Sequence, residues 1–230
     1  MMTDTKRPAG VADLAAMLDA DRGRALTLTS VSRETARRLD DFVKLLLQWQ
    51  ATTNLIAPST IGEVWTRHIA DSLQLVPLAP RARIWVDLGS GAGFPGLVIA
   101  CAQADVPGTT VHLVESNAKK AAFLREAARI TGAPAHIHAV RIEEFVTHFH
   151  AHVDVVTARA LAPLDRLLPL IAPLLKRGAQ ALLMKGQDVE AELTQASKYW
   201  NIRATSVASK TDPNASILVV HSLTPRQIKA

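Results

Sequence analysis

Residues 84–96, IWVDLGSGAGFPG, are the part of the chain that most strongly indicates its fold. A short apolar run ends at an acidic residue, Asp87, and a glycine-rich turn containing Gly89 and Gly91 follows immediately. Glycines let the backbone bend tightly and approach a ligand closely. Pro95 suits the first turn of a helix, where its missing N–H costs nothing. The stretch therefore predicts a strand, a ligand-binding turn and a helix.

The rest of the chain after residue 83 alternates between β-rich runs and helical patterns. Expected strands lie at 84–88, 110–114, 135–140, 153–157 and 179–184, with helices at 95–103, 118–131, 164–174 and 189–199. Such alternation predicts a parallel sheet with helices on both faces. Two last strands, at 202–207 and 216–222, follow each other without a helix and predict a hairpin. The predicted fold class is α/β: a Rossmann-like, mostly parallel sheet of seven strands, preceded by an N-terminal helical extension.

Three segments are expected along the chain. Residues 1–28 are expected to form a flexible, loosely held tail with at most one short helix, residues 29–80 a helical extension, and residues 81–230 the sheet domain. Ser30 or Ser32 can cap a helix that runs to about residue 50, and helical patterns continue over 60–76.

Composition narrows the class of protein. Of the 230 residues, 48% are hydrophobic and 20% charged, which is ordinary for a folded domain. A net charge of +5 moderately favours a polyanionic partner. Cys101 is the single cysteine, so no internal disulfide can form and a reducing compartment fits. Without an apolar leader or a long apolar run, we expect a cytoplasmic protein with no membrane partner.

The glycine turn also fits the GxGxxG fingerprint of dinucleotide-binding proteins. Two features argue against that interpretation. Asp87 ends the strand just before the first glycine, where a carboxylate would face a cationic methionyl amine. Phe94 and Pro95 crowd the helix N-terminus that a pyrophosphate would need. The D-x-G-x-G-x-G spacing is typical of class I methyltransferases that use S-adenosyl-L-methionine, although a purely structural turn remains the alternative.

Residues after the second and third strands complete a candidate cofactor site. Glu115 ends the second strand, where an acid can accept hydrogen bonds from both ribose hydroxyls. The alternative is that Glu115 and Ser116 only cap the next helix; Ser116 is also a cofactor-binding candidate. After the third strand, Ile142 would pack on the adenine ring and Glu143 would read its edge.

The sequence after the fourth strand, Thr157-Ala-Arg159-Ala, bears on which atom is methylated. It lacks the N/D-P-P-F/Y pattern of enzymes acting on exocyclic amines, and no Lys-Asp-Lys-Glu set for ribose methylation is evident. A pyrimidine C5 methylase needs a cysteine nucleophile, but Cys101 falls inside a predicted helix. An acceptor that is already nucleophilic, such as guanine N7, needs no general base.

These motifs together resemble the RsmG family, also called glucose-inhibited division protein B, whose bacterial members methylate N7 of one guanine in the decoding region of 16S rRNA. The resemblance covers about residues 46–192. It rests on Trp49 with Asn54-Leu55, on segments 67–72, 87–96 and 141–145, and on 157–160 and 185–187. It implies cofactor contacts at Gly89, Phe94, Glu115, Ile142, Glu143 and Arg159. It also implies catalytic or substrate roles for Arg141, Arg159, Lys119 and Lys185. The expected partner is 16S rRNA or the 30S subunit, and the expected state is a monomer.

Several polar residues allow two interpretations. Asn54 lies in a family motif and is an RNA candidate, and Lys185 should emerge at the carboxyl edge of the sheet or be a solvated strand end. His68 and Asp71 share a helical face with Ser72 and border a guanine pocket or form a structural network.

Basic residues and histidines complete the candidate list. Arg33, Arg37, Arg38 and Lys44 form a stripe that tracks phosphates or is only solvated. The alternating histidines at 148, 150 and 152 lack acidic or cysteine partners in pattern, so no metal is expected. A small-molecule methyltransferase and a non-enzymatic RNA-binding protein of this fold are the alternative functions.

Overall fold

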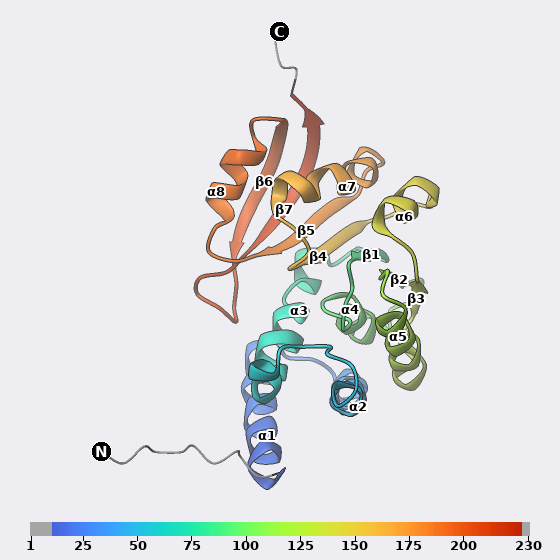
Figure 1. Cartoon of the computed structure of the whole chain (residues 1–230), viewed down its shortest axis with the longest axis vertical. Helices are drawn as coiled ribbons and strands as arrows, with labels where there is room; N and C mark the ends of the chain where they lie inside the picture. Colours follow the sequence, from blue (N-terminus) through green and yellow to red (C-terminus); the bar gives the residue numbers. More distant parts are fainter. Residues whose placement is uncertain (1–10, 227–230) are drawn as a thin grey trace, which may run out of the picture.

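The computed structural model describes residues 11–226 and contains one seven-stranded sheet in the order β3-β2-β1-β4-β5-β7-β6 (Figure 1). The strands are β1 (Ile84–Leu88), β2 (Thr110–Val114), β3 (Ala135–His138), β4 (Val155–Arg159), β5 (Gln180–Lys185), β6 (Trp200–Ala208) and β7 (Ser216–Pro225). All neighbours are parallel except that β7 runs antiparallel to β5 and β6. The predicted sheet with its terminal hairpin is confirmed.

Helices cover both faces of the sheet. One hydrophobic core joins the sheet to α2 (Arg33–Gln50), α4 (Gly96–Ala102) and α5 (Ala118–Thr131). A second core, on the other face, joins it to α6 (Ile142–His148), α7 (Leu164–Lys176) and α8 (Val189–Ala196). Because side chains alternate along a strand, neighbouring β1 residues Trp85 and Val86 belong to different cores.

Helix α2 is an integral part of the first core. Ser32 caps it by accepting a hydrogen bond from the Thr35 N–H, as the sequence predicted. Its Phe42 ring lies 5.5 Å from Phe94 of the glycine turn and 6.2 Å from Phe123 of α5. The helical extension and the sheet domain therefore share one apolar interior.

Within the expected tail, residues 11–28 form one helix, α1 (Val11–Leu28), which at 18 residues is longer than the short helix expected there. Asp21 is fully buried and accepts hydrogen bonds from the backbone N–H groups of Trp65, at 2.8 Å, and Thr66, at 3.1 Å. Arg22 also pairs with Asp40 of α2 at 2.6 Å. This helix is anchored largely by polar contacts, which an analysis of hydrophobic periodicity does not detect. Residues 1–10 of the expected tail lie outside the described part of the chain.

The expected helical pattern over 60–76 is divided into four short segments. They are a 3₁₀ turn η1 (Pro58–Glu63), a π-helical segment η2 (Trp65–Ala70), α3 (Asp71–Leu73) and a second 3₁₀ turn η3 (Val76–Leu78). In Figure 1 this region lies between α1 and the sheet. π-Helical turns are rare and often occur at functional sites. Here the π-helical segment carries Arg67 and His68.

Candidate functional site

The glycine turn between β1 and α4 is packed tightly on one side and open on the other. At Gly89, with φ of +71°, a Cβ would lie 2.7 Å from Cδ1 of Leu161, so the leucine side chain would have to shift. At Gly91, with φ of +55°, a Cβ would meet only the Gly89 carbonyl oxygen, at 3.8 Å. Positive φ favours glycine at both positions. The backbone is therefore accessible for close approach by a ligand at Gly91.

Asp87 stabilises this turn by linking the start of α4 to β4. One carboxylate oxygen accepts from Thr157 Oγ1 at 2.8 Å and the other from the Gly96 N–H at 3.1 Å. The residue is only 1% exposed, and burial raises the pKa of its carboxyl to about 6. The sequence placed this carboxylate against a methionyl amine. Within the protein each of its oxygens has one partner, and a carboxylate oxygen can accept a second hydrogen bond.

Glu115 follows β2 and reaches the same turn. Its carboxylate accepts from the Gly91 N–H at 2.9 Å and from the Asn117 N–H at 2.7 Å. The helix-cap role belongs to Asn117, whose side chain accepts from two N–H groups of α5. Each Glu115 oxygen has one of these contacts and keeps a further lone pair for a ligand. Ser116 is exposed beside it.

Five other residues that the sequence predicted as site residues lie apart from the contact between Gly91 and Glu115, or at its margin. Ile142 is half-buried against the second core, while Arg141 and Glu143 next to it are exposed at the start of α6. Lys119 is exposed in the first turn of α5. Asn54 is exposed and contacts Gln50 at 3.5 Å. These polar residues are accessible to a large partner but do not meet one another in a pocket.

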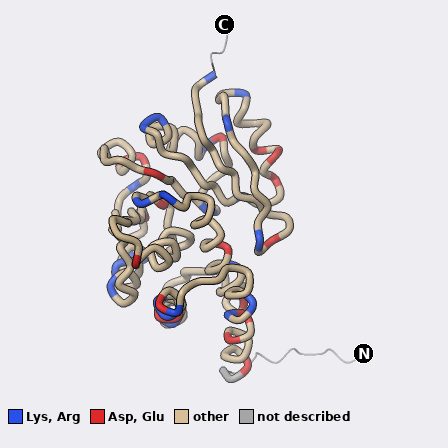
Figure 2. The backbone as a smooth tube through the Cα atoms, turned by 180° about the vertical axis from the view of Figure 1, so that it is seen from behind, with Lys and Arg blue, Asp and Glu red and all other residues tan. Residues whose placement is uncertain are grey.

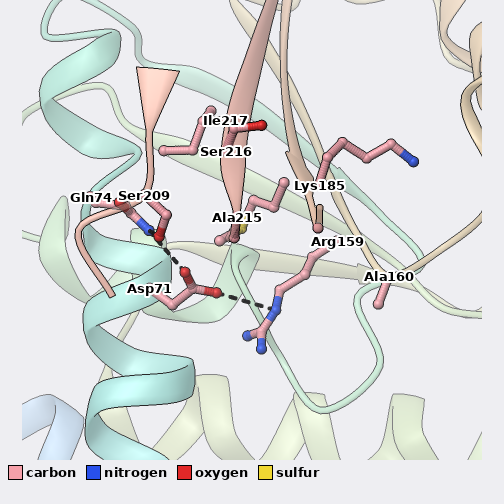
Figure 3. Close-up of a pocket in the computed structure, with 11 residues that line it drawn as sticks. Asp71, Gln74, Arg159, Ala160, Lys185, Ser209, Ala215, Ser216 and Ile217 are labelled. Carbon is pink, nitrogen blue, oxygen red and sulfur yellow. Dashed lines mark hydrogen bonds and ion pairs between the residues drawn. The ribbon is translucent and has the colours of Figure 1, made fainter. Parts of the chain in front are cut away.

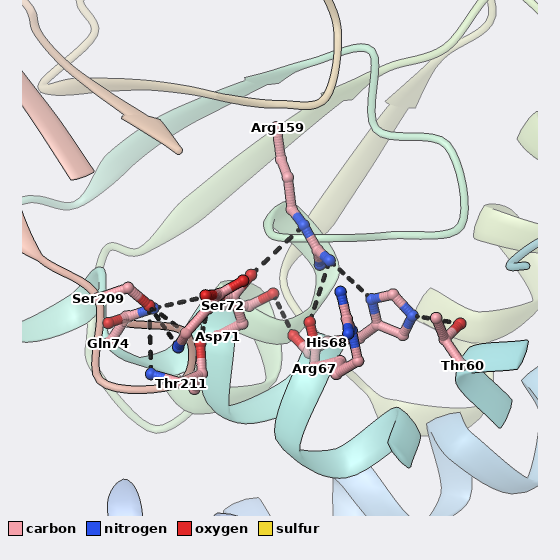
Figure 4. A network of polar contacts seen from close by, with 10 residues as sticks. Thr60, Arg67, His68, Asp71, Ser72, Gln74, Arg159, Ser209 and Thr211 are labelled. Atoms are coloured by element: carbon pink, nitrogen blue, oxygen red, sulfur yellow. Dashed lines mark hydrogen bonds and ion pairs between the residues drawn. The ribbon is translucent and has the colours of Figure 1, made fainter. Parts of the chain in front are cut away.

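Arg159, at the end of β4, is the centre of a second cluster (Figure 4). Its Nη2 donates to the Arg67 carbonyl at 3.0 Å and to Nδ1 of His68 at 2.8 Å, and its Nε lies 3.4 Å from Asp71 Oδ2. The guanidinium lies over the Phe94 ring at 5.9 Å. Arg159 thus joins β4 to the helical extension and to the glycine turn.

The contacts of His68 define its protonation state. Arginine can only donate, so the Nδ1 atom that Arg159 approaches must be the acceptor. The proton is then on Nε2, which lies 3.1 Å from Oγ1 of Thr60. Burial and the nearby charges of Arg159 and Arg67 lower the pKa of His68 to about 3. The neutral ring stacks on Phe94 at 4.8 Å.

Asp71 connects this cluster to the loop between β6 and β7. Its Oδ1 accepts from Thr211 Oγ1 at 2.7 Å and from Gln74 Nε2 at 2.8 Å, and Gln74 also contacts Ser209. Burial raises the pKa of Asp71, while Arg159 and these hydrogen bonds lower it. Gln74, Ser209 and Thr211 were not predicted. Their partners are distant in the sequence, and no local motif marks them.

Lys185 is neither free at the sheet edge nor solvated. Its side chain is only 9% exposed; Nζ lies 2.6 Å from Glu192 and donates to the Ala162 carbonyl at 2.9 Å. Glu192 also accepts from the Leu164 N–H at 2.7 Å. In Figure 3 the Lys185 side chain points away from Asp71 and Arg159. Lys185 therefore ties β5 to α7 and α8.

Two kinds of chemistry were not expected from the sequence: a cysteine nucleophile and a metal site. Cys101 is buried in α4, and burial raises the pKa of its thiol to about 12, so it is no nucleophile. Within residues 11–226, no group of three metal-ligating side chains could hold an ion. His152 instead pairs with Asp154 at 2.7 Å.

The basic stripe of α2 is interrupted by acidic partners. Arg38 makes a two-pronged ion pair with Asp105, at 2.7 and 2.8 Å, whereas Arg33, Arg37 and Lys44 are exposed. Figure 2 shows acidic positions among the basic ones in the helical extension. Across residues 11–226, none of the helices is both long and apolar enough to span a membrane.

The sheet order, the antiparallel β7 and the glycine turn define a class I methyltransferase fold. Solved structures support this class. The chain is similar to cofactor-bound Rv0187 from MTB, with a TM-score of 0.56, 14% identity and coverage of 89% of this chain and 96% of that one. It is equally similar to an O-methyltransferase from Bacillus cereus in complex with SAH, with a TM-score of 0.56, 12% identity and coverage of 91% and 100%.

Sequence comparison identifies the family. The sequence model of the GidB family, described as rRNA small subunit methyltransferase G, matches residues 35–217. A ribosomal RNA small subunit methyltransferase G from Bradyrhizobium sp. (strain BTAi1) is 59% identical over 204 residues, which cover 89% of this chain and 92% of the relative. One from Nitrobacter hamburgensis is 62% identical over 192 residues, covering 84% and 74%. The chain belongs to this family of rRNA methyltransferases, as its motifs indicated, and its methyl donor is S-adenosyl-L-methionine.

Proposed function

We propose that this enzyme methylates N7 of a guanine in the decoding region of 16S rRNA. The supporting observation is that the Arg159 cluster offers no free general base. His68 is neutral, with Nδ1 engaged by Arg159 and a pKa of about 3, and Asp71 accepts contacts from Arg159, Thr211 and Gln74. Removing a proton from an acceptor would require such a base within hydrogen-bond reach. Guanine N7 carries a free lone pair and needs none.

The protein's contribution is then binding and orientation. S-adenosyl-L-methionine supplies an electrophilic methyl group when bound. The accessible backbone at Gly91 and the carboxylate of Glu115 fit its adenosyl group, with Ser116, Ile142 and Glu143 beside them. Asp87 keeps the turn in shape, and Phe94 supports His68 and Arg159. Correct orientation of two reactants can remove about 7–11 kcal/mol from a barrier.

Exposed polar residues near the sheet edge suit an RNA partner. Arg141 and Lys119 are solvent-accessible at the N-termini of α6 and α5, and Asn54 is exposed in the helical extension. Arginine and lysine that neutralise phosphates make affinity dependent on salt. We propose that these residues contact 16S rRNA or the 30S subunit. We also propose that a monomer acts in the cytoplasm, where ribosomal subunits are assembled.

The test uses the purified enzyme and a labelled methyl donor. Incubation with 30S subunits, naked 16S rRNA and a metabolite extract should place label in 16S rRNA, as 7-methylguanosine by mass spectrometry of nucleosides. Borohydride reduction followed by aniline cleaves RNA at 7-methylguanosine and should map a single position. Label on an exocyclic amine, on a ribose or in a metabolite would overturn the N7 assignment. An Arg159→Ala enzyme is the inactive control.

A further inference from the structure

A hollow of about 190 Å³ borders the Arg159 cluster (Figure 3). Its lining includes Asp71 and Arg159, the apolar side chains of Met184 and Ile217, and Ser216. Ser216 begins β7 directly opposite Lys185, the last residue of β5. Because β7 is antiparallel, its start lies at the same edge as the ends of β4 and β5, where open α/β sheets bind ligands.

Two residues of this lining each have a buried polar atom that lacks a partner. Among residues 11–226, four buried side-chain nitrogen or oxygen atoms make no hydrogen bond, and two of these are Arg159 Nη1 and Ser216 Oγ. The other nitrogens of Arg159 are engaged by His68, Asp71 and the Arg67 carbonyl. Buried polar groups are almost always paired, so unpaired ones suggest a missing partner. Both residues line the hollow, so a polar ligand that enters it and turns these two side chains can supply the missing partners.

We propose that this hollow holds the target guanine, turned out of the RNA, with Ser216 as a residue that selects guanine. This inference rests on the proposed N7 methylation. Guanine O6 lies beside N7 on one edge of the base, and both are acceptors. Arg159 Nη1 donates to O6 while N7 faces the cofactor side of Arg159. Ser216 Oγ, free to rotate without breaking a hydrogen bond, accepts from the 2-amino group.

The same arrangement disfavours adenine. Adenine carries an amino group, a donor, where guanine carries O6, and this donor would face the guanidinium. Adenine also lacks the 2-amino group that Ser216 would bind. Met184 and Ile217 supply apolar contact for the ring. Enzymes that modify a base commonly take it out of the stack and read its edge with hydrogen bonds.

Nucleotide binding to the full-length protein tests the hollow without methyl transfer. Guanosine, inosine and adenosine monophosphates are titrated against the wild type, Ser216→Ala and Ser222→Ala, with NMR shifts of labelled protein as the readout. Inosine lacks only the 2-amino group. The wild type should bind guanosine monophosphate roughly three- to tenfold more tightly than inosine monophosphate, the value of one hydrogen bond. Ser216→Ala should lose this preference, and Ser222→Ala, an exposed position on the same strand, should keep it.

Methylation of rRNA carrying guanosine or inosine at the target position should show the same pattern. A preference retained by Ser216→Ala, or shifts that avoid the hollow, would overturn this inference. Absence of any difference between the two nucleotides in the wild type would overturn it as well. If rRNA is still methylated at N7 in those cases, the proposed function stands without the hollow. If the hollow selects guanosine but the enzyme never forms 7-methylguanosine, the proposed function fails instead.

Discussion

The two halves of the candidate site are built differently. The half near β1 and β2 relies on backbone groups: Glu115 binds the Gly91 N–H across 24 residues, and Asp87 binds the Gly96 N–H across 9. The half around Arg159 relies on side chains from distant segments; Arg159 and His68 are 91 residues apart, and Asp71 and Thr211 are 140 apart. Damage to the first half should therefore weaken cofactor binding, and damage to the second should slow methyl transfer.

Replacing Arg159 with lysine should have the largest effect. Lysine keeps the charge but lacks the planar group that contacts His68, Asp71 and the Arg67 carbonyl together. We expect single-turnover methylation of bound RNA to fall about 10²-fold, the usual cost of misplacing reactants by about 1 Å. Cofactor affinity, measured by calorimetry, should change much less. An equal loss of affinity and rate would remove the distinction between the halves; Arg166→Lys, at an exposed position on α7, is the control.

Removing the Glu115 carboxylate tests the first half. Glu115→Ala should weaken S-adenosyl-L-methionine binding by about 1.5–3 kcal/mol, typical of hydrogen bonds to a charged group. Calorimetric titration measures this, and Glu126→Ala on the exposed face of α5 is the matched control. Unchanged affinity in a folded Glu115→Ala variant would mean that the carboxylate only fastens the turn to α5. Saturating cofactor should restore most of the rate.

A pair of near-isosteric substitutions separates the two nitrogens of His68. Asparagine places an amide oxygen near Nδ1, the atom that Arg159 contacts, whereas glutamine places its amide near Nε2, which faces Thr60. Both remove the stacking on Phe94 equally. We expect His68→Asn to methylate roughly tenfold faster than His68→Gln, because only asparagine keeps an acceptor for the arginine. Equal rates, with equal melting temperatures, would show that His68 acts by packing alone.

The smallest expected effect is that of pH on the chemical step. With a pKa of about 3, His68 is neutral throughout pH 7–9, and Asp87, with a pKa of about 6, is ionised. Single-turnover methylation at saturating substrates should therefore be nearly flat over this range, unlike the bell produced by a general acid and base. A steep profile that disappears in the His68 or Asp71 variants would mean that the acceptor is deprotonated, and N7 would be wrong.

Lowering the pH should change the stability of the fold and not the rate of the chemical step. The pKa of His68 is lowered by burial, so the folded state resists protonation that the unfolded chain accepts below about pH 6.5. This contribution to stability is complete above pH 6.5 and is lost as pH falls toward 3. The raised pKa of Asp87 has the opposite effect, because it stabilises the folded state as pH falls from about 6 to 4.

The succession of strands and helices along the chain and the glycine turn were predictable because they depend on local patterns. Alternating β-rich and helical runs predict a parallel sheet, and D-x-G-x-G-x-G marks its first loop. The order of the strands within the sheet, β3-β2-β1-β4-β5-β7-β6, was not predicted. The length of α1 was not predicted, because part of its anchor is the buried carboxylate of Asp21, which hydrophobic periodicity does not detect. The π-helical segment η2 was missed because its residues also fit an ordinary helical pattern.

The fold class, the family and the glycine turn could be predicted from the sequence, since they depend on motifs whose parts are neighbours in the chain. The contacts of Arg159 and Thr211 with Asp71, and that of Lys185 with Glu192, could be found only in the folded protein. The physical reason is that a buried polar side chain needs partners, but many polar residues along the chain could supply them. Which ones do so depends on how the helical extension and the β6–β7 loop close over the end of β4.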